Sequence, residues 1–373
     1  MVDKEPLQIK NQENTKQSAT DMLYFEKWLS ILGERKATDL HLSVGNVPML
    51  RLDGNINPLI EEDVVTTERI QMIVEHLLSE QEKIILEKEK QIILSRTLKK
   101  VMRFRIHIFY ARGFLCMSLR NLPNSFPSLE EFPNAQVLLN IISSTQGLFI
   151  ISGPFDSGKT TTARSMISEI NKTQEKYIAT LELPIEYLIP SEKSVVVQRG
   201  IGIDVKSFSD GLDEMHDHDV DVVVVSAIES AEVLEKAILM ANSGRLVIAI
   251  ISAKHVVSVL ETLRDLVPEE DRIRILHLLG DALLGISNQL LLQKVGGGRT
   301  LVVSSMVSTT PIKSLIYDGK FDQIPNIMQT SIEQGMITTD KALSVAVKKG
   351  EISLKDAQEN AVDKNQFNIL VSH

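Results

Sequence analysis

Residues 147–167 read GLFIISGPFDSGKTTTARSMI and contain the pattern GxxxxGK[ST] from Gly153 to Thr160. The apolar run GLFIIS predicts a buried strand, and the residues after the pattern predict a helix, which is the context that a phosphate-binding loop needs. Glycines let backbone N–H groups approach phosphate oxygens, and the N-terminus of a helix favours negative charge. The stretch therefore predicts a P-loop that binds a nucleoside triphosphate.

The residues of this loop have separate expected roles. Lys159 is expected to reach the β- and γ-phosphates, and the Thr160 hydroxyl is expected to ligate Mg²⁺. We expect the side chain of Asp156 to point outward, because a carboxylate is an unusual neighbour for phosphate. The predicted cofactors are ATP and Mg²⁺, and the other predicted nucleotide-binding residues of the loop are Gly153, Pro154, Ser157, Gly158 and Thr161.

Short apolar runs alternate with helical segments around the P-loop. KYIATLEL (176–183), SVVVQ (194–198), DVVVVSA (221–227) and RLVIAIIS (245–252) predict further strands. Such alternation indicates a largely parallel sheet with helices on both faces, hence an α/β fold. From about Pro311 onward the chain is predicted to be helical.

The N-terminal part of the chain predicts a separate mixed α/β domain. DLHLSV (39–44) and MLRLDG (49–54) alternate apolar and polar residues, as strands do, and residues 70–86 have helical spacing. RFRIHIFYARGFLCMSLR (103–120) predicts a strand hairpin that turns near Arg112 and Gly113. The predicted organisation is a disordered arm (1–20), an N-terminal domain (21–120), a proline-containing linker (121–133), an ATP-binding domain (134–310) and a helical C-terminal region (311–373).

Composition limits the partners and the compartment. The formal net charge is −9, so nucleic acid is not an expected partner. The chain has a single cysteine, Cys116, which lies in an apolar run. No intrachain disulfide can therefore form, which fits a cytoplasmic protein. No apolar run reaches the ~20 residues that a membrane span needs. We expect a cytoplasmic protein that reaches the inner membrane only through partners.

Several motifs follow one another in a characteristic order. They are ATDLHLSVGNVPMLRLDG (37–54), RFRIHIFYARG (103–113), LRNLP (119–123), GPFDSGKTTT (153–162), TLELPIEY (180–187), VVQRGIG (196–202), SNQLLLQKVGGGR (287–299) and SLIYDGK (314–320). In this array the chain resembles the pilus-retraction (twitching-motility, PilT-like) ATPases of the type II/IV secretion (GspE-like) family. The resemblance implies a PAS-like α+β N-terminal domain, a RecA-like P-loop NTPase domain and a helical C-terminal region.

The resemblance also implies site residues and an assembly. Glu182 and Glu186, in the acidic motif, are the predicted catalytic residues. Arg103 and Arg120 are predicted to reach the phosphates bound by a neighbouring subunit, and Arg105 and Arg112 are further candidates for this role. Members of the family form hexameric rings, hydrolyse ATP between subunits and pull on a pilus platform protein in the inner membrane.

The chain departs from the family pattern where hydrolysis is performed. Leu183 replaces an aspartate of the acidic motif, and Ser226–Ala227 replace a Gly-Glu pair after the strand DVVVV. Ser252 stands where the family has histidine, and His255 follows three residues later. We align Asp213 and Asp217 with two family arginines. Loss of one preorganised catalytic group typically costs about 10²–10³ in rate, and losses that act as a unit are not additive.

These observations predict an ATP-binding subunit of a type IV pilus retraction or secretion motor with attenuated hydrolysis. The alternative is a catalytically inactive regulatory or structural paralogue that modulates an active pilus ATPase. The expected assembly is a homo-hexamer or a mixed ring with an active paralogue. A DNA-handling P-loop protein is disfavoured by the net charge and by the N-terminal motif.

Overall fold

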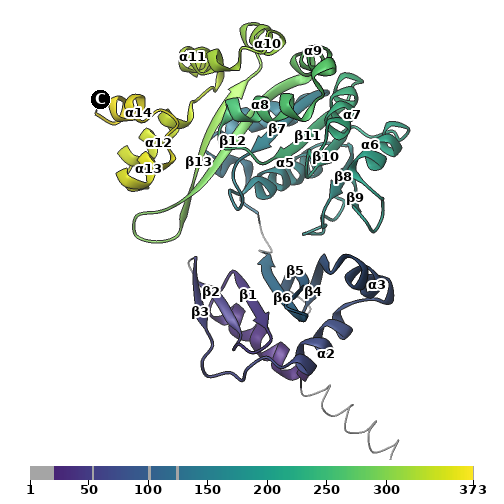
Figure 1. Cartoon of the computed structure of the whole chain (residues 1–373). Coiled ribbons are helices and arrows are strands. Elements are labelled where there is room, and N and C mark those ends of the chain that lie inside the picture. The colour runs from purple at the N-terminus through teal and green to yellow at the C-terminus, as the bar shows by residue number, and fades with distance from the viewer. Residues whose placement is uncertain (1–20, 53, 100–101, 123–125, 373) are drawn as a thin grey trace, which may run out of the picture. The chain divides into compact units, whose positions relative to one another are not determined.

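The computed structural model describes residues 21–52, 54–99, 102–122 and 126–372. The chain forms two compact units, one of Met1–Asn124 with Pro184–Tyr187, the other of Ser125–Leu183 with Leu188–His373 (Figure 1). The predicted N-terminal arm lies outside the described residues, as do residues 123–125 of the predicted linker.

The N-terminal unit is a helical and antiparallel β structure. Residues 21–34 are helical, and the sheet has the strand order β3-β2-β1-β6-β5-β4. Its elements are β1 (Asp39–Ser43), β2 (Met49–Leu52), β3 (Asn55–Pro58), α2 (Thr67–Leu77), α3 (Glu80–Glu89), β4 (Gln91–Leu98), β5 (Met102–Ala111) and β6 (Phe114–Leu122).

Alternation along β5 explains how this unit buries one face of its sheet. Phe104, Ile106 and Ile108 are fully buried and pack in a core that includes Trp28. The intervening residues point to the opposite face, as the period of two along a strand requires. The predicted hairpin is confirmed, since β5 and β6 pair antiparallel across the two-residue turn Arg112–Gly113. Both turn residues have positive φ, 55° and 83°, as a tight hairpin with right-handed strand twist favours.

The helix predicted over residues 70–86 is two helices, so that prediction was wrong in its continuity. Leu78, after α2, is extended with ψ 137°, and Ser79 begins α3. The Ser79 hydroxyl accepts from the Glu82 backbone N–H while Glu82 accepts from the Ser79 N–H, a capping box. The Ser-x-x-Glu pattern was the local signal for this break.

The C-terminal unit is built on a mostly parallel sheet with the strand order β13-β12-β7-β11-β10-β8-β9. Its strands are β7 (Gly147–Ser152), β8 (Tyr177–Glu182), β9 (Val195–Gly200), β10 (Val222–Val225), β11 (Leu246–Ile251), β12 (Leu283–Gln293) and β13 (Arg299–Val307). Strands β12 and β13 pair antiparallel, and the other neighbouring pairs are parallel.

Helices cover both faces of this sheet, which confirms the predicted α/β fold. Leu148 and Ile150 point into a core with the helices α6 to α9, whereas Phe149 and Ile151 point into a core with α4 and α5. Continuous apolar strands are typical of parallel sheets buried on both faces. The covering helices are α4 (Ala135–Ile142), α5 (Lys159–Thr173), α6 (Phe208–His216), α7 (Ala231–Asn242), α8 (Val256–Leu266) and α9 (Arg272–Ala282).

The C-terminal region is helical, as predicted. Its helices are α10 (Thr310–Tyr317), α11 (Ile324–Thr330), α12 (Thr339–Lys348), α13 (Leu354–Asn360) and α14 (Lys364–Ser372). Leu343 and Phe367, from α12 and α14, share a core with Leu290 of β12 and Val302 of β13. Among the described residues, no helix is long and apolar enough to cross a membrane.

Candidate functional site

The loop after β7 has the backbone of a phosphate-binding loop. Gly153 has φ 152° and Gly158 has φ 88°, both in the region that favours glycine. A Cβ atom at Gly153 would lie 2.3 Å from the Gln289 carbonyl oxygen and 2.4 Å from the Ser157 hydroxyl, so only glycine fits there. Gly158 caps α5, and Lys159, Thr160 and Thr161 form its first turn. The backbone N–H groups of this helix N-terminus are therefore available to an anion.

Lys159 folds back over its own loop. Its ammonium group donates to the carbonyl oxygens of Gly153 (2.9 Å) and Pro154 (2.6 Å). Burial lowers the pKa of Lys159 below its ordinary value, although the carboxylate of Asp156 opposes this. The Ser157 hydroxyl is buried and has no hydrogen-bond partner among the described residues. A half-desolvated cation and an unsatisfied hydroxyl are the groups that a bound phosphate would satisfy.

The parallel strands bring several sequence-predicted residues to the same edge of the sheet. Ligand sites in open α/β sheets lie outside the carboxyl ends of the strands. The P-loop follows β7, Glu182 ends β8, Ala227 lies just beyond β10, and Ser252 follows β11. Because Ser152 pairs with Ile251, Ser252 leaves its strand beside the start of the P-loop.

The carboxylate of Glu182 forms an ion pair and hydrogen bonds within the C-terminal unit. It lies 2.9 Å from the Arg164 guanidinium of α5 in a buried ion pair. It also accepts from the Thr180 hydroxyl and from the Gln198 amide, each at 2.8 Å. The side chains of Arg164 and Glu182 are 3% and 9% exposed. This carboxylate therefore joins α5, β8 and β9, and each of its oxygens already accepts hydrogen bonds.

The ends of β10 and β11 carry small or exposed side chains. Strand β10 stops at Val225, and the Ser226 N–H donates to the Leu181 carbonyl oxygen at 3.0 Å. Ala227 is half-buried and Glu229 is exposed. Ser252 is exposed directly after β11. No carboxylate occupies positions 226–228, and none occupies 252.

His255 is used as a helix cap. Its Nδ1 accepts from the Ser258 backbone N–H at 3.1 Å at the start of α8, and the Ser258 hydroxyl and backbone complete a capping box. Burial lowers the pKa of His255 below its ordinary value. A ring whose Nδ1 accepts this hydrogen bond carries its proton on Nε2 when it is neutral.

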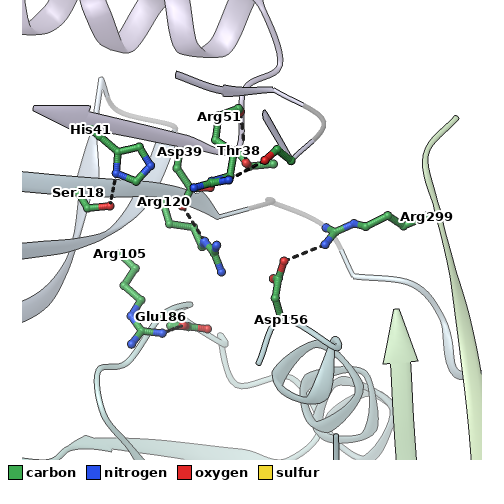
Figure 2. Close-up of polar contacts among 11 residues, drawn as sticks. Thr38, Asp39, His41, Arg51, Arg105, Ser118, Arg120, Asp156, Glu186 and Arg299 are labelled. Carbon is green, nitrogen blue, oxygen red and sulfur yellow. Dashed lines mark hydrogen bonds and ion pairs between the residues drawn. The ribbon is translucent and has the colours of Figure 1, made fainter. Parts of the chain in front are cut away.

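Arg105 and Arg120 of the N-terminal unit have partners inside that unit (Figure 2). Arg120 pairs with Asp39 at 2.9 Å, and Arg105 pairs with Glu186 at 3.3 Å. The Arg103 guanidinium donates to the carbonyl oxygens of Glu186 and, at 2.9 Å, of Ile185. Glu186 thus belongs to the segment Pro184–Tyr187, which is grouped with the N-terminal unit, whereas Glu182 belongs to the C-terminal unit.

Sequence reasoning assigned no role to two buried amides of β12. Asn288 donates to the Ser152 hydroxyl (3.0 Å) and to the Ala253 carbonyl oxygen (3.2 Å), and Gln289 donates to the Thr162 hydroxyl (2.7 Å). These residues therefore tie β12 to the strand before the P-loop, to the helix after it and to the segment after β11. The sequence signal that could have identified them is the run of polar residues that precedes three leucines in SNQLLLQ (287–293), because polar side chains in a buried strand need hydrogen-bond partners.

Comparison with known proteins agrees with the motif array. Residues 22–298 match the family described as Type II/IV secretion system protein. The type IV pilus retractation ATPase PilT of Pseudomonas aeruginosa is 29% identical over 339 residues, which are 91% of this chain and 98% of that protein. The type IV pilus ATPase PilU of the same organism is 28% identical over 348 residues, 93% of this chain and 91% of that protein. The crystal structure of the pilus retraction motor PilT with bound ADP is 33% identical, with a TM-score of 0.81, and covers 91% of this chain and 97% of that chain.

Proposed function

The chain belongs to the Type II/IV secretion system protein family, and we propose that it is an ATP-binding subunit of a PilT-like pilus retraction or secretion motor with attenuated hydrolysis. One contrast supports the proposal: a complete phosphate-loop pattern lies beside strand ends that carry Ala227 and Ser252, where the resemblance leads us to expect a carboxylate and an imidazole. In the proposed site Gly153 to Thr161 hold ATP, and the Thr160 hydroxyl ligates Mg²⁺.

Binding is supported by the geometry of the loop. Phosphates would take the α5 N–H groups, and Lys159 would exchange its two loop carbonyls for phosphate oxygens. Both acceptors are neutral, so a charged phosphate is the stronger partner. Mg²⁺ would neutralise phosphate charge, which is the chemistry that this ion supplies in P-loop proteins.

Attenuated hydrolysis is supported by the residues around the loop. An attacking water needs a group that orients it and a charge that stabilises the transition state. Ala227 and Ser252 supply neither a carboxylate nor an imidazole, and His255 caps α8. Glu182 is paired with Arg164, which leaves Glu186 as the better candidate to act on water.

A regulatory or structural paralogue is the second candidate, and the same losses at Ala227 and Ser252 favour it. In that role the chain binds ATP, completes a ring and modulates an active subunit through coupling between sites. Assembly as a homo-hexamer or as a mixed ring fits the preference of oligomers for closed symmetry. We place the complex at the inner membrane through a pilus platform protein, with Arg103 and Arg120 directed to a neighbour's nucleotide after exchanging their present partners.

Two assays on the same preparation test the proposal. A fluorescent ATP analogue with Mg²⁺ is titrated into the purified chain, and steady-state release of phosphate is measured in parallel. Saturable binding with turnover far below the ~10 s⁻¹ enzyme median is the expected result. Failure to bind would reject the proposed site, and turnover near the median would reject attenuation.

Native mass spectrometry of the tagged protein from its own cell separates the two candidates. Recovery with a related chain that has glutamate at the position of Ala227 would support the regulatory role. Homo-hexamers with no related subunit would count against a mixed ring and favour the first candidate.

A further inference from the structure

An acidic residue lies in the middle of the proposed anion-binding loop. Asp156 has φ 62°, a left-handed backbone conformation that is uncommon outside glycine, asparagine and aspartate. Its carboxylate opposes the loop's own function, because phosphates are anions. A positive charge beside Asp156 would reduce this repulsion.

Arg299 supplies that charge from a distant part of the chain. The hairpin between β12 and β13 passes through Gly296, Gly297 and Gly298, which have φ of 92°, 104° and 79°. Arg299 follows as the first residue of β13, and its guanidinium lies 2.9 Å from the Asp156 carboxylate (Figure 2). The hairpin thus presents a cation to a carboxylate that lies 143 positions away in sequence.

The exposure of this pair determines what it contributes. The side chains of Arg299 and Asp156 are 44% and 48% exposed, so the pair adds little to folding stability. A charge at the edge of an anion site acts differently, because it also interacts with each charge of the ligand. Removal of one unit of positive charge a few ångströms from a triphosphate corresponds to roughly a three- to tenfold rise in Kd at ~0.1 M salt.

We propose that Arg299 is a positioning residue of the nucleotide site, which sets ATP affinity by neutralising Asp156 and holding its carboxylate against the β12–β13 hairpin. This inference rests on the ATP binding proposed above. It adds a determinant of affinity that lies outside the P-loop pattern and comes from a different strand.

Four proteins test the inference in one titration with a fluorescent ATP analogue and Mg²⁺. They are the full wild-type chain, Arg299→Ala, Asp156→Asn and the double variant. Asparagine tolerates left-handed φ, so Asp156→Asn removes the charge and preserves the loop. We expect Arg299→Ala to raise Kd roughly three- to tenfold. The double variant should return to within about twofold of the wild type, because it lacks both charges and the local net charge is again that of the wild type.

Arg274→Ala is the matched control. Arg274 forms an exposed ion pair with Glu235 at 2.6 Å in the same unit, so its removal changes net charge equally away from the loop. Its Kd should equal that of the wild type. The defect of Arg299→Ala should also shrink in ~0.5 M salt, where the Debye length is only a few ångströms.

Each outcome decides a different point. If wild type and Arg299→Ala bind equally well, the inference is wrong while the proposed function stands. If the double variant binds as weakly as Arg299→Ala, Arg299 acts directly on the ligand and the neutralising role is rejected. If the wild type itself does not bind, the proposed function fails and the inference fails with it.

Discussion

The phosphate loop and the ends of β10 and β11 lie at the same edge of one sheet, yet only the loop has the residues that the resemblance leads us to expect. The loop keeps its glycines, its lysine and its hydroxyl, whereas the strand ends carry Ala227 and Ser252. Binding depends on one contiguous segment and largely on backbone N–H groups. Hydrolysis depends on side chains that several strands contribute separately, so it can be lost while binding persists.

Breaking the buried ion pair should give the largest effect and tests whether Glu182 belongs to the scaffold. Arg164→Met leaves the Glu182 carboxylate charged and buried, and removal of one partner from such a pair costs about 3–5 kcal/mol. The midpoint of urea unfolding should fall accordingly. Arg164→Met with Glu182→Gln should recover much of the loss. If Arg164→Met is as stable as the wild type, the ion pair does not stabilise the fold, and Glu182 is again a candidate catalytic residue.

The second largest effect is expected from introducing a carboxylate at position 227 and an imidazole at position 252. Wild-type turnover should lie about 10²–10³ below that of a competent enzyme, and Ala227→Glu with Ser252→His should raise it. Steady-state phosphate release measures both. Ala227→Gln with Ser252→His is the matched control, since it has the same size without the carboxylate. Equal rates for these two double variants would show that no missing charge limits the reaction.

The third prediction concerns the phosphate loop and tests whether Lys159 binds ATP. Lys159→Ala should weaken ATP binding about 10- to 100-fold, as expected for loss of a charge-assisted hydrogen bond. Titration with the fluorescent analogue gives the Kd. Lys172→Ala, an exposed position on the same helix, is the control and should bind normally. Equal affinity of Lys159→Ala and wild type would mean that ATP does not use this loop.

The smallest effect concerns His255. Since burial lowers its pKa below the ordinary 6.5, the unfolded chain binds the proton first as pH falls. The contribution of the neutral His255 ring to the free energy of unfolding is complete above pH 6.5. It is lost as pH drops from 6.5 toward the lower pKa of the folded state. His255→Asn keeps a capping side chain that does not titrate. The urea midpoint of His255→Asn should fall less than that of the wild type between pH 7.5 and 5.5. Identical decreases in the two proteins would show that His255 does not contribute to the pH dependence of stability.

Local patterns predicted the P-loop, the apolar strands around it and the β5–β6 hairpin, because each depends on residues adjacent in sequence. The partner of Glu182 was not predictable in this way, since Arg164 reaches it only when α5 packs beside the end of β8. The same holds for Asn288, whose contact with Ser152 follows from the pairing of β12 with β7. Strand order and register determine these contacts, and they are not encoded in any short pattern.

Strand β12 connects two parts of the C-terminal unit, because it contacts residues beside the P-loop and also packs against the C-terminal helices α12 and α14. Near its middle, Asn288 and Gln289 contact the P-loop region, and Leu290 enters the core formed with Leu343 and Phe367. Its eleven residues are hydrogen-bonded to β13 along most of their length, which makes a stiff ribbon. A displacement of α12 or α14 would therefore reach Ser152 and Thr162, on either side of the P-loop, through one continuous strand.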